Sequence, residues 1–322
     1  MTVKEKVLEI FQSNVGQSVS GQEIADMIGV SRNCVWKTVS QLKDEGYLIS
    51  SQTKSGYTFL PDNDIFNVTS IKSLMKSNHN VVIFDKESSS NTIAKELAAA
   101  DAQEGTVIIV KSQTGGKGRM GRSFISKSEN GLYMSIILRP RLSAAQSVNV
   151  TVLGAVAVAE AIEETSGEEC KIKWVNDIFM RGKKVCGILT EASVDLESGQ
   201  LEYAIIGIGV NIAPPSKDGF PDEIKDIAGS IYTGSSPKGY KSLLAARIID
   251  KFFEYYPNIE KKEYIKPYKD RSDIIGKPVA VYRGKEVVCG IAKDIDDDAC
   301  LIVDTGDGIM KFNSGEARVR KV

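Results

Sequence analysis

The spacing of hydrophobic residues in the first 60 positions predicts three short helices followed by a hairpin. Apolar residues recur every three or four positions through residues 3–11, which is typical of a helix with one buried face. A Ser-x-x-Glu capping box at residues 20–23 begins a second helix, and Ser31 caps a third over residues 32 to about 45. Two β-rich runs then flank a polar turn at residues 51–56, which completes the pattern of a winged helix-turn-helix. The second helix is expected to bury Ile24, Met27 and Ile28.

The third predicted helix carries one apolar and one polar face. At about 100° per residue, Val35, Val39 and Leu42 fall on one side, and amide, hydroxyl and cationic side chains fall on the other. A helix that reads DNA needs this division, because one face anchors in the core while the other meets base edges and phosphates. The residues predicted to contact DNA are Ser31, Arg32, Asn33, Lys37 and Ser40.

Charge does not decide whether DNA or another protein is the partner of this helix. Residues 1–62 contain six Lys/Arg and seven Asp/Glu, and a winged helix used for protein contacts would show a similar solvated face. The motif pattern, together with the basic residue Lys54 in the predicted wing, favours DNA. A module this small reads a short half-site, so we expect a dimer on a palindromic operator.

Strands and helices alternate from residue 81 onward, which predicts a mixed α/β domain with a largely antiparallel sheet. The segment 274–322 consists of short strands between Gly and Asp turns, typical of a small SH3-like β-barrel. The predicted fold is therefore α+β. The predicted domains are a winged helix-turn-helix DNA-binding domain at 1–62, a mixed α/β catalytic domain at 66–272 and the barrel at 273–322. We expect strands at 81–84, 106–110, 132–138, 171–174, 185–191 and 203–210, and helices at 71–77, 91–102, 148–165 and 240–255.

Composition narrows the chemistry that this chain can perform. Of 322 residues, 42% are hydrophobic and 26% are charged, with no apolar run long enough to span a membrane, so we expect a cytoplasmic protein without membrane attachment. Five scattered cysteines, none in a C-x-x-C pair, argue against disulfides and against a zinc site. The single histidine, His79, excludes a multi-His metal centre, and its expected loop position argues against a Ser-His-Asp triad. An enzyme of this composition would work through fixed charges, backbone dipoles and a bound metal–nucleotide, with no metal site made by the protein alone.

A glycine-rich basic segment is the most distinctive local feature of the sequence. Residues 111–128 contain five cations and no acid, and residues 116–121 formally match the G-x-G-x-x-G dinucleotide motif. That match fails in context, because Gly121 leads into a polar, turn-rich stretch and not into a helix that could hold a pyrophosphate. Small glycines let a backbone close over a ligand, and the interleaved cations suit phosphate or carboxylate. The alternative, a solvated charged loop, fits the alternation of glycines and cations less well.

Five separate motifs resemble those of biotin–protein ligases in order and spacing. The N-terminal 60 residues look like the repressor module of the bifunctional members of that family, and the closing strands look like its C-terminal barrel. The resemblance covers nearly the whole chain, and its specificity lies in the set and not in any one motif. The motifs are Ser89–Asn91, Gln113 to Arg122, Lys173-Trp-Val-Asn-Asp177, Gly182 to Leu189 and Gly207-Ile-Gly-Val-Asn211.

The resemblance implies a two-step reaction that uses biotin, ATP and Mg²⁺. The biotin carboxylate attacks the α-phosphate of ATP, giving biotinyl-5′-adenylate and pyrophosphate, and a lysine of a biotin carboxyl carrier protein then attacks the mixed anhydride. Biotin would be bound by Ser89, Ser90, Asn91, Gln113, Lys117, Gly118, Arg119 and Lys184. ATP would be bound by Arg122, Lys173, Asn176, Asp177, Asn211 and Arg320. The catalytic charges would be those of Lys184, Arg119 and Lys173.

The same resemblance implies that the adenylate-bound protein forms a homodimer that binds operator DNA. The chain departs from the family pattern at three positions. Lys117 stands where arginine is usual, Val175 stands where proline is usual, and Ala299 replaces an expected glycine. None of these changes removes a proposed functional group, although a lysine lacks the forked donor of an arginine.

Three other functions fit parts of the sequence. A ligand-sensing regulator without catalysis would not need the cations of the site, and a lipoate ligase would use a related fold. A nucleotide-dependent oxidoreductase is disfavoured by the context of the glycine-rich segment. Formation of the adenylate from biotin and ATP would separate the ligase from the first two.

Overall fold

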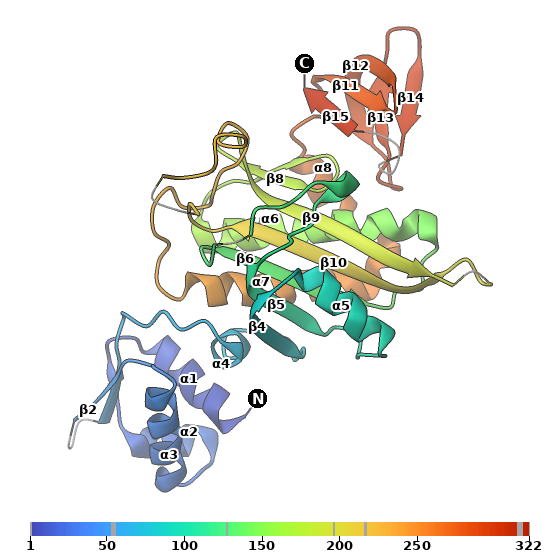
Figure 1. The fold of residues 1–322 in the computed structure, drawn as a ribbon. Coiled ribbons are helices and arrows are strands. Elements are labelled where there is room, and N and C mark those ends of the chain that lie inside the picture. The colour runs from blue at the N-terminus through green and yellow to red at the C-terminus, as the bar shows by residue number, and fades with distance from the viewer. Residues whose placement is uncertain are drawn as a thin grey trace. The chain divides into compact units, whose positions relative to one another are not determined.

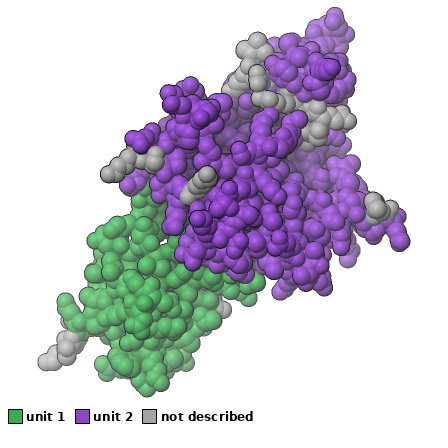
Figure 2. Space-filling model, viewed as in Figure 1, with its two compact units in different colours: residues 1–81, 236–250 green, residues 82–235, 251–322 purple. Residues whose placement is uncertain are grey.

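The computed structural model describes residues 2–52, 56–126, 128–195, 197–215, 218–313 and 318–321. The chain divides into two compact units, coloured separately in Figure 2. Unit 1 contains Met1–Val81 together with Ser236–Asp250, and unit 2 contains Val82–Ser235 together with Lys251–Val322.

Unit 1 contains the predicted winged helix-turn-helix (Figure 1). The capping box at Ser20 and Glu23 forms, and the Ser31 hydroxyl accepts a hydrogen bond from the Cys34 amide at 3.2 Å, so both predicted helix starts are confirmed. The three strands pair in the order β1-β3-β2. The elements are α1 (Val3–Ser13), β1 (Ser18–Val19), α2 (Gly21–Ile28), α3 (Arg32–Asp44), β2 (Ile49–Gln52), β3 (Gly56–Phe59) and α4 (Val68–Lys72).

Two expectations for unit 1 were wrong in detail. Met27 is 68% exposed, whereas Ile24 and Ala25 are buried, because in a helix of two turns the hydrophobic pattern leaves the buried stripe uncertain by one position. The short helix expected at 71–77 is α4, which begins earlier because the Asn67 side chain accepts a hydrogen bond from the Ser70 amide at 2.8 Å.

The centre of unit 2 is a seven-stranded sheet in the order β4-β5-β6-β10-β9-β8-β7 (Figure 1). Its pairs from β5 through β7 are antiparallel, as predicted. The strand β8 was missed, because it begins at the aspartate of an Asn-Asp pair that indicates a turn. The strands are β4 (Val81–Glu87), β5 (Val107–Gln113), β6 (Gly131–Leu138), β7 (Lys171–Lys173), β8 (Asp177–Met180), β9 (Lys183–Val194) and β10 (Leu201–Asn211).

Helices cover both faces of this sheet. Neighbouring side chains of a strand point to opposite faces, so Ile205 packs with α5 (Ser90–Ala99) while Ile206 lies against Gly154 of α6 (Val148–Ser166). Within the described chain, one helical stretch, Ala144–Ser166, is long and apolar enough to cross a membrane. Of its apolar window 72% is buried inside the structure, so this stretch is the core helix of the unit. The remaining helices are α7 (Tyr240–Tyr255), of which residues 251–255 belong to unit 2, and α8 (Ile265–Asp270).

The C-terminal segment forms a five-stranded antiparallel sheet in the order β14-β13-β12-β11-β15. Ala299, which replaces an expected glycine, has φ +60°, the left-handed conformation that glycine adopts at least cost. Its carbonyl accepts a hydrogen bond from the Trp174 indole at 2.9 Å, so this sheet is attached to the end of β7. The strands are β11 (Pro278–Arg283), β12 (Glu286–Ile295), β13 (Leu301–Asp304), β14 (Ile309–Phe312) and β15 (Arg318–Lys321).

Candidate functional site

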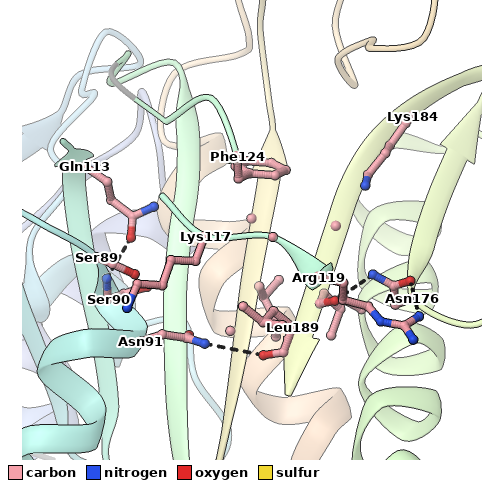
Figure 3. Close-up of a pocket in the computed structure, with 16 residues that line it drawn as sticks. Ser89, Ser90, Asn91, Gln113, Lys117, Arg119, Phe124, Asn176, Lys184 and Leu189 are labelled. Carbon is pink, nitrogen blue, oxygen red and sulfur yellow. Dashed lines mark hydrogen bonds between the residues drawn. The ribbon is translucent and has the colours of Figure 1, made fainter. Parts of the chain in front are cut away.

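A narrow polar cavity, which we call the slot, opens where the first turn of α5 meets the ends of β5, β9 and β10 (Figure 3). The Ser90 amide donates to Gln113 Oε1 at 2.7 Å, which joins the start of the helix to the end of β5. Ser135 Oγ donates to Asn91 Oδ1 at 2.6 Å, which joins the same turn to β6. The structure therefore brings together residues far apart in sequence that were predicted to bind biotin: Ser89, Ser90, Asn91, Gln113, Lys117, Gly118, Arg119 and Lys184 all line the slot.

The two glycines of the Gly207-Ile-Gly209 motif leave the β10 wall of the slot without side chains at these positions. A Cβ atom added at Gly207 would lie 2.0 Å from Asn91 Oδ1, and one added at Gly209 would lie 2.7 Å from the Phe124 ring. Neither position can hold even a methyl group without moving a residue that lines the slot. Phe124 was not predicted as a site residue, since its position after a disfavoured dinucleotide motif gave no sign that the ring returns to the sheet.

The glycine-rich segment folds back on itself beside the slot. The Phe124 amide donates to the Gly116 carbonyl at 2.9 Å, and the Gly118 amide donates to the Arg122 carbonyl at 2.7 Å. The described residues 122–126 form no helix, which confirms that the dinucleotide motif is a chance match. Lys127, one of the five cations, lies outside the described residues.

Arg119 is the residue through which this segment meets the opposite wall. Its Nη1 donates to Asn176 Oδ1 at 3.1 Å, and Asn176 Nδ2 in turn donates to the Ile188 carbonyl at 2.8 Å (Figure 3). Burial lowers the pKa of the Arg119 guanidinium, while the nearby Asp177 carboxylate acts in the opposite direction. The guanidinium stays charged near neutral pH because arginine titrates far above it.

Lys184 and Asp177 form an ion pair between β9 and β8. The Lys184 Nζ lies 2.6 Å from Asp177 Oδ1, and both side chains are about one quarter exposed, at 28% and 27%. A register shift between Ile178 and Phe179 separates the pairing of Asp177 with Gly187 from that of Phe179 with Lys184. Sequence spacing alone could not show this pairing, because a bulge of that kind changes which side chains share a face.

A larger cavity continues from the slot and is rich in cations. The slot and the larger cavity share Gly118, Arg119, Phe124, Asn176 and Lys184, so a ligand that runs from one to the other passes these residues. The Lys173 Nζ lies 5.8 Å from the centre of the Phe179 ring. The residues predicted to bind ATP that line this cavity are Arg122, Lys173, Asn176 and Asp177, and two further cations that were not predicted are Lys171 and Arg181.

Two residues predicted to bind ATP are placed differently. Asn211, although described, lines neither cavity, and its side-chain amide donates to the Gly229 carbonyl at 3.0 Å. The backbone of Arg320 pairs with Ala280 in the C-terminal sheet, while its side chain lies outside what the structure describes. Their roles remain predictions.

In unit 1, the residues predicted to contact DNA lie on the solvent side of α3. Ser31, Arg32, Asn33 and Lys37 are exposed and Ser40 is partly exposed, whereas Val35, Val39 and Leu42 are buried. Trp36 is 57% exposed among them and was not predicted, because a tryptophan at helical spacing usually indicates a core position. Lys54, the expected basic residue of the wing, lies outside the described residues.

These features define a class of protein before any comparison. A slot lined by buried neutral polar groups can hold a neutral ligand head, and the cations that follow can bring a carboxylate and a phosphate together despite their mutual repulsion. Joined to a helix-turn-helix, this arrangement is that of a carboxylate-activating ligase that also carries a DNA-binding module.

Comparison with known proteins places the chain in one family. Residues 83–211 match the biotin/lipoate A/B protein ligase family, residues 3–58 match a helix-turn-helix domain, and residues 274–320 match the biotin protein ligase C-terminal domain. The chain is 34% identical over 321 residues to the bifunctional ligase/repressor BirA of Bacillus subtilis, covering 98% of each protein. It is 22% identical over 326 residues to BirA of Escherichia coli, covering 99% of this chain and 98% of that protein.

A solved structure shows the same fold. The biotin protein ligase from Aquifex aeolicus in complex with biotin and ATP is similar to this chain with a TM-score of 0.62 and 26% identity, over 76% of this chain and 99% of that one. The protein belongs to the family of bifunctional biotin–protein ligases and repressors.

Proposed function

We propose that this protein is an ATP-dependent biotin–protein ligase that makes biotinyl-5′-adenylate, transfers biotin to a carrier-protein lysine and represses transcription in response to biotin. The observation that carries this proposal is the continuity of the slot with the cationic cavity through Arg119, Asn176 and Lys184. Mixing the protein with biotin and ATP should give the adenylate, detected by mass, together with pyrophosphate. Lipoate in place of biotin should give neither, and failure with biotin would leave a sensing function without catalysis.

The geometry supports binding of biotin in the slot and of the nucleotide in the larger cavity. Ser89, Ser90, Asn91 and Gln113 would hold the biotin head group, since all four are buried and the last three are hydrogen-bonded into fixed positions. Lys117, Gly118 and Arg119 would close over the carboxylate and adenylate, and Lys184 would stabilise charge at the reacting phosphorus. The nucleotide would be bound by Lys173, Asn176, Asp177 and Arg122, with Asn211 and Arg320 as further proposed contacts.

Mg²⁺ is proposed to enter together with ATP. Within the described chain, no group of three His, Cys, Asp or Glu residues could hold a metal ion. Mg²⁺ needs only one or two carboxylates when phosphate oxygens and water complete its shell, and the proposed ligands are Asp177 and Asp226, which line the larger cavity. When bound, the ion would neutralise charge on the triphosphate.

The remaining proposals concern partners, location and domains. A biotin carboxyl carrier protein would present the acceptor lysine, and α3 would contact operator DNA through Ser31, Arg32, Asn33, Lys37 and Ser40. We also propose a cytoplasmic location and a three-domain division at 1–62, 66–272 and 273–322.

We expect the glycine-rich segment to be ordered by ligand. Glycines and mutually repelling cations between residues 114 and 128 favour many conformations until an anion neutralises them. Limited trypsin digestion should therefore cleave at Lys117, Arg119 and Arg122 at least ten times more slowly with biotin and ATP than without. Equal cleavage in both conditions would contradict ligand-dependent ordering.

We expect biotin and ATP to shift the protein from monomer toward dimer and to raise its affinity for operator DNA. The polar face of α3 neutralises few phosphates, so a monomer binds weakly, while two copies on a palindrome double the contacts. The ligand can produce this shift only if the adenylate binds the dimer-competent state more tightly. Sedimentation and DNA binding at one fixed salt concentration, with and without ligands, measure both effects. A tight dimer without ligand, or equal DNA affinity in both states, would refute the coupling.

A further inference from the structure

Glu191 lies on β9 and contacts two residues of the first turns of α5. Its Oε2 accepts a hydrogen bond from Asn91 Nδ2 at 2.8 Å, and its Oε1 lies 2.8 Å from the Lys95 Nζ. Asn91 and Lys95 are one helical turn apart, so a single carboxylate holds both ends of that turn. Among the described residues Glu191 lines neither cavity, yet Asn91, which it holds, lines the slot.

Two acceptors fix which way the Asn91 amide faces: the Glu191 carboxylate, 2.8 Å from Asn91 Nδ2, and the more distant Leu189 carbonyl at 3.5 Å. Asn91 Oδ1 accepts from Ser135 Oγ at 2.6 Å and lies on the side of Gly207, where an added Cβ would be 2.0 Å away. A hydroxyl both donates and accepts, so Ser135 would tolerate either orientation of the amide, whereas an ionised carboxylate only accepts. Reversing the amide would bring Oδ1 against Glu191 Oε2, two acceptors without a proton between them.

The surroundings of Glu191 keep its carboxylate ionised. Burial alone would raise the pKa of Glu191, but hydrogen bonds from Lys95 and Asn91, with the charges of Lys95 and Lys117, outweigh it and hold the pKa below its ordinary value. The carboxylate is therefore ionised at neutral pH, and the orientation of Asn91 is fixed before any ligand arrives.

We propose that Glu191 is a positioning residue of the slot, which fixes the Asn91 amide with its oxygen on the Gly207 side and so sets the slot to accept a hydrogen bond from a ligand N–H. This inference rests on the proposed function, in which the N–H belongs to the ureido ring of biotin. A slot preset in this way recognises the head group without first reorienting a buried amide.

Three variants separate orientation of the amide from simple attachment of α5 to β9. Glu191→Ala leaves the amide with only the 3.5 Å contact to the Leu189 carbonyl and should raise the KM for biotin at least tenfold, while the KM for ATP and kcat change by less than about threefold. Glu191→Gln can still accept from Asn91 through its carbonyl oxygen and should restore the KM to within about threefold of the wild type. Lys95→Met removes the ion pair but leaves the contact with Asn91, and should change the KM for biotin less than about twofold. Pyrophosphate release, with biotin varied at saturating ATP and ATP varied at saturating biotin, measures all three variants.

Two outcomes would overturn the positioning role. If Lys95→Met raises the KM for biotin as much as Glu191→Ala does, the carboxylate acts only as an ion-pair clamp. If Glu191→Ala leaves that KM unchanged, or Glu191→Gln fails to restore it, the orientation of the amide is not set by Glu191. Failure of the proposed function itself would look different, because the wild type would then release no pyrophosphate in response to biotin.

The indole of Trp36 on α3 is exposed. It shares one face of α3 with Asn33 and Ser40, which lie three and four residues from it along the helix, and the exposed Lys37 follows it directly in sequence. Residues 32–43 include three cations and no acid, so this face is complementary to a polyanion. An apolar ring among hydrogen-bonding groups matches the major groove, where the only apolar group on a base edge is the thymine methyl.

The geometry points to Trp36 as a residue that reads a thymine methyl in the operator half-site. Because the operator is unidentified, binding sites are first selected from a random-sequence duplex pool with the full-length protein, biotin and ATP. Each thymine of the selected site is then replaced by deoxyuracil, which removes only the methyl group. At one thymine per half-site the wild type should lose about fourfold in affinity, the contribution of one buried methyl.

The same duplexes test the residue. Trp36→Ala should bind the thymine and uracil sites equally, whereas Met27→Ala, which removes an exposed apolar side chain from α2, should keep the wild-type discrimination. Discrimination by Trp36→Ala that equals the wild type, or a wild type insensitive to uracil at every position, would overturn this role. A wild type that enriches no sequence would overturn DNA binding as a whole.

Discussion

Replacing Lys184 with alanine should lower the rate of biotinyl-adenylate formation by about 100-fold or more, the usual loss of one preorganised charge at a reacting centre. The Lys184 Nζ lies at the junction of the two cavities, 2.6 Å from Asp177, where a carboxylate and an α-phosphate would meet. In the wild type the Asp177 carboxylate holds the ammonium group in place before substrates bind, so little reorganisation is needed during reaction. Single-turnover pyrophosphate release measures the loss.

Lys183 supplies the matched control for this experiment. It precedes Lys184 in the sequence, but its Nζ donates to the carbonyls of Lys225 and Asp226, and among the described residues it lines neither cavity. Lys183→Ala should therefore retain adenylate formation to within about threefold, apart from any loss of stability. If Lys184→Ala, shown to be folded by its thermal unfolding, reacts at the wild-type rate, the proposed role of Lys184 is wrong.

Replacing Arg119 with glycine should speed the release of bound adenylate by about 10- to 100-fold, the range expected for loss of charge-assisted hydrogen bonds. The Arg119 guanidinium joins the glycine-rich segment to Asn176 across the junction of the cavities, so its loss removes both a contact to the ligand and the attachment of the segment. If the adenylate drives dimerisation, the same variant should lose operator affinity although α3 is unchanged.

Two measurements test the Arg119 prediction, one of adenylate release and one of operator binding. The release rate is measured by trapping the dissociated adenylate with excess unmodified competitor protein. Sedimentation with operator DNA measures how far operator binding depends on the bound adenylate. Arg141→Gly, at an exposed arginine of the same unit, serves as the control and should leave both unchanged. Faster release with undiminished operator binding would show that repression does not depend on retention of the adenylate.

The sequence was most informative where local chemistry decides structure. The hydroxyls of Ser20 and Ser31 begin two helices as predicted, because a cap needs only residues within three positions. The residues of the slot were predicted from a set of motifs. The fold explains why they meet, because the end of β5, the first half of β9, the last part of β10 and the start of α5 lie together around the slot.

The features that escaped prediction depend on contacts between distant segments. The pairing of Lys184 with Asp177 depends on a register shift between β8 and β9, and the contact of Glu191 with Asn91 joins residues one hundred positions apart. Phe124 reaches the sheet only because the glycine-rich segment folds back. The exposure of Trp36 and Met27 likewise reflects which side of a short helix meets the core, which a pattern of a few residues leaves open.

Phe124 and the bare strands beside it also suggest how the range of ligands could be altered. Gly187 and Gly209 are cross-strand partners, and a Cβ atom on either would lie within 3.3 Å of the aromatic ring, so the ring and the backbone already fit each other. Removing the ring, as in Phe124→Ala, would leave a cavity beside Gly187 and Gly209, which have no side chains to fill it. A ligand analogue carrying a complementary bulky substituent would then fit the engineered protein and be excluded from the natural one, giving an orthogonal enzyme–substrate pair from a single substitution.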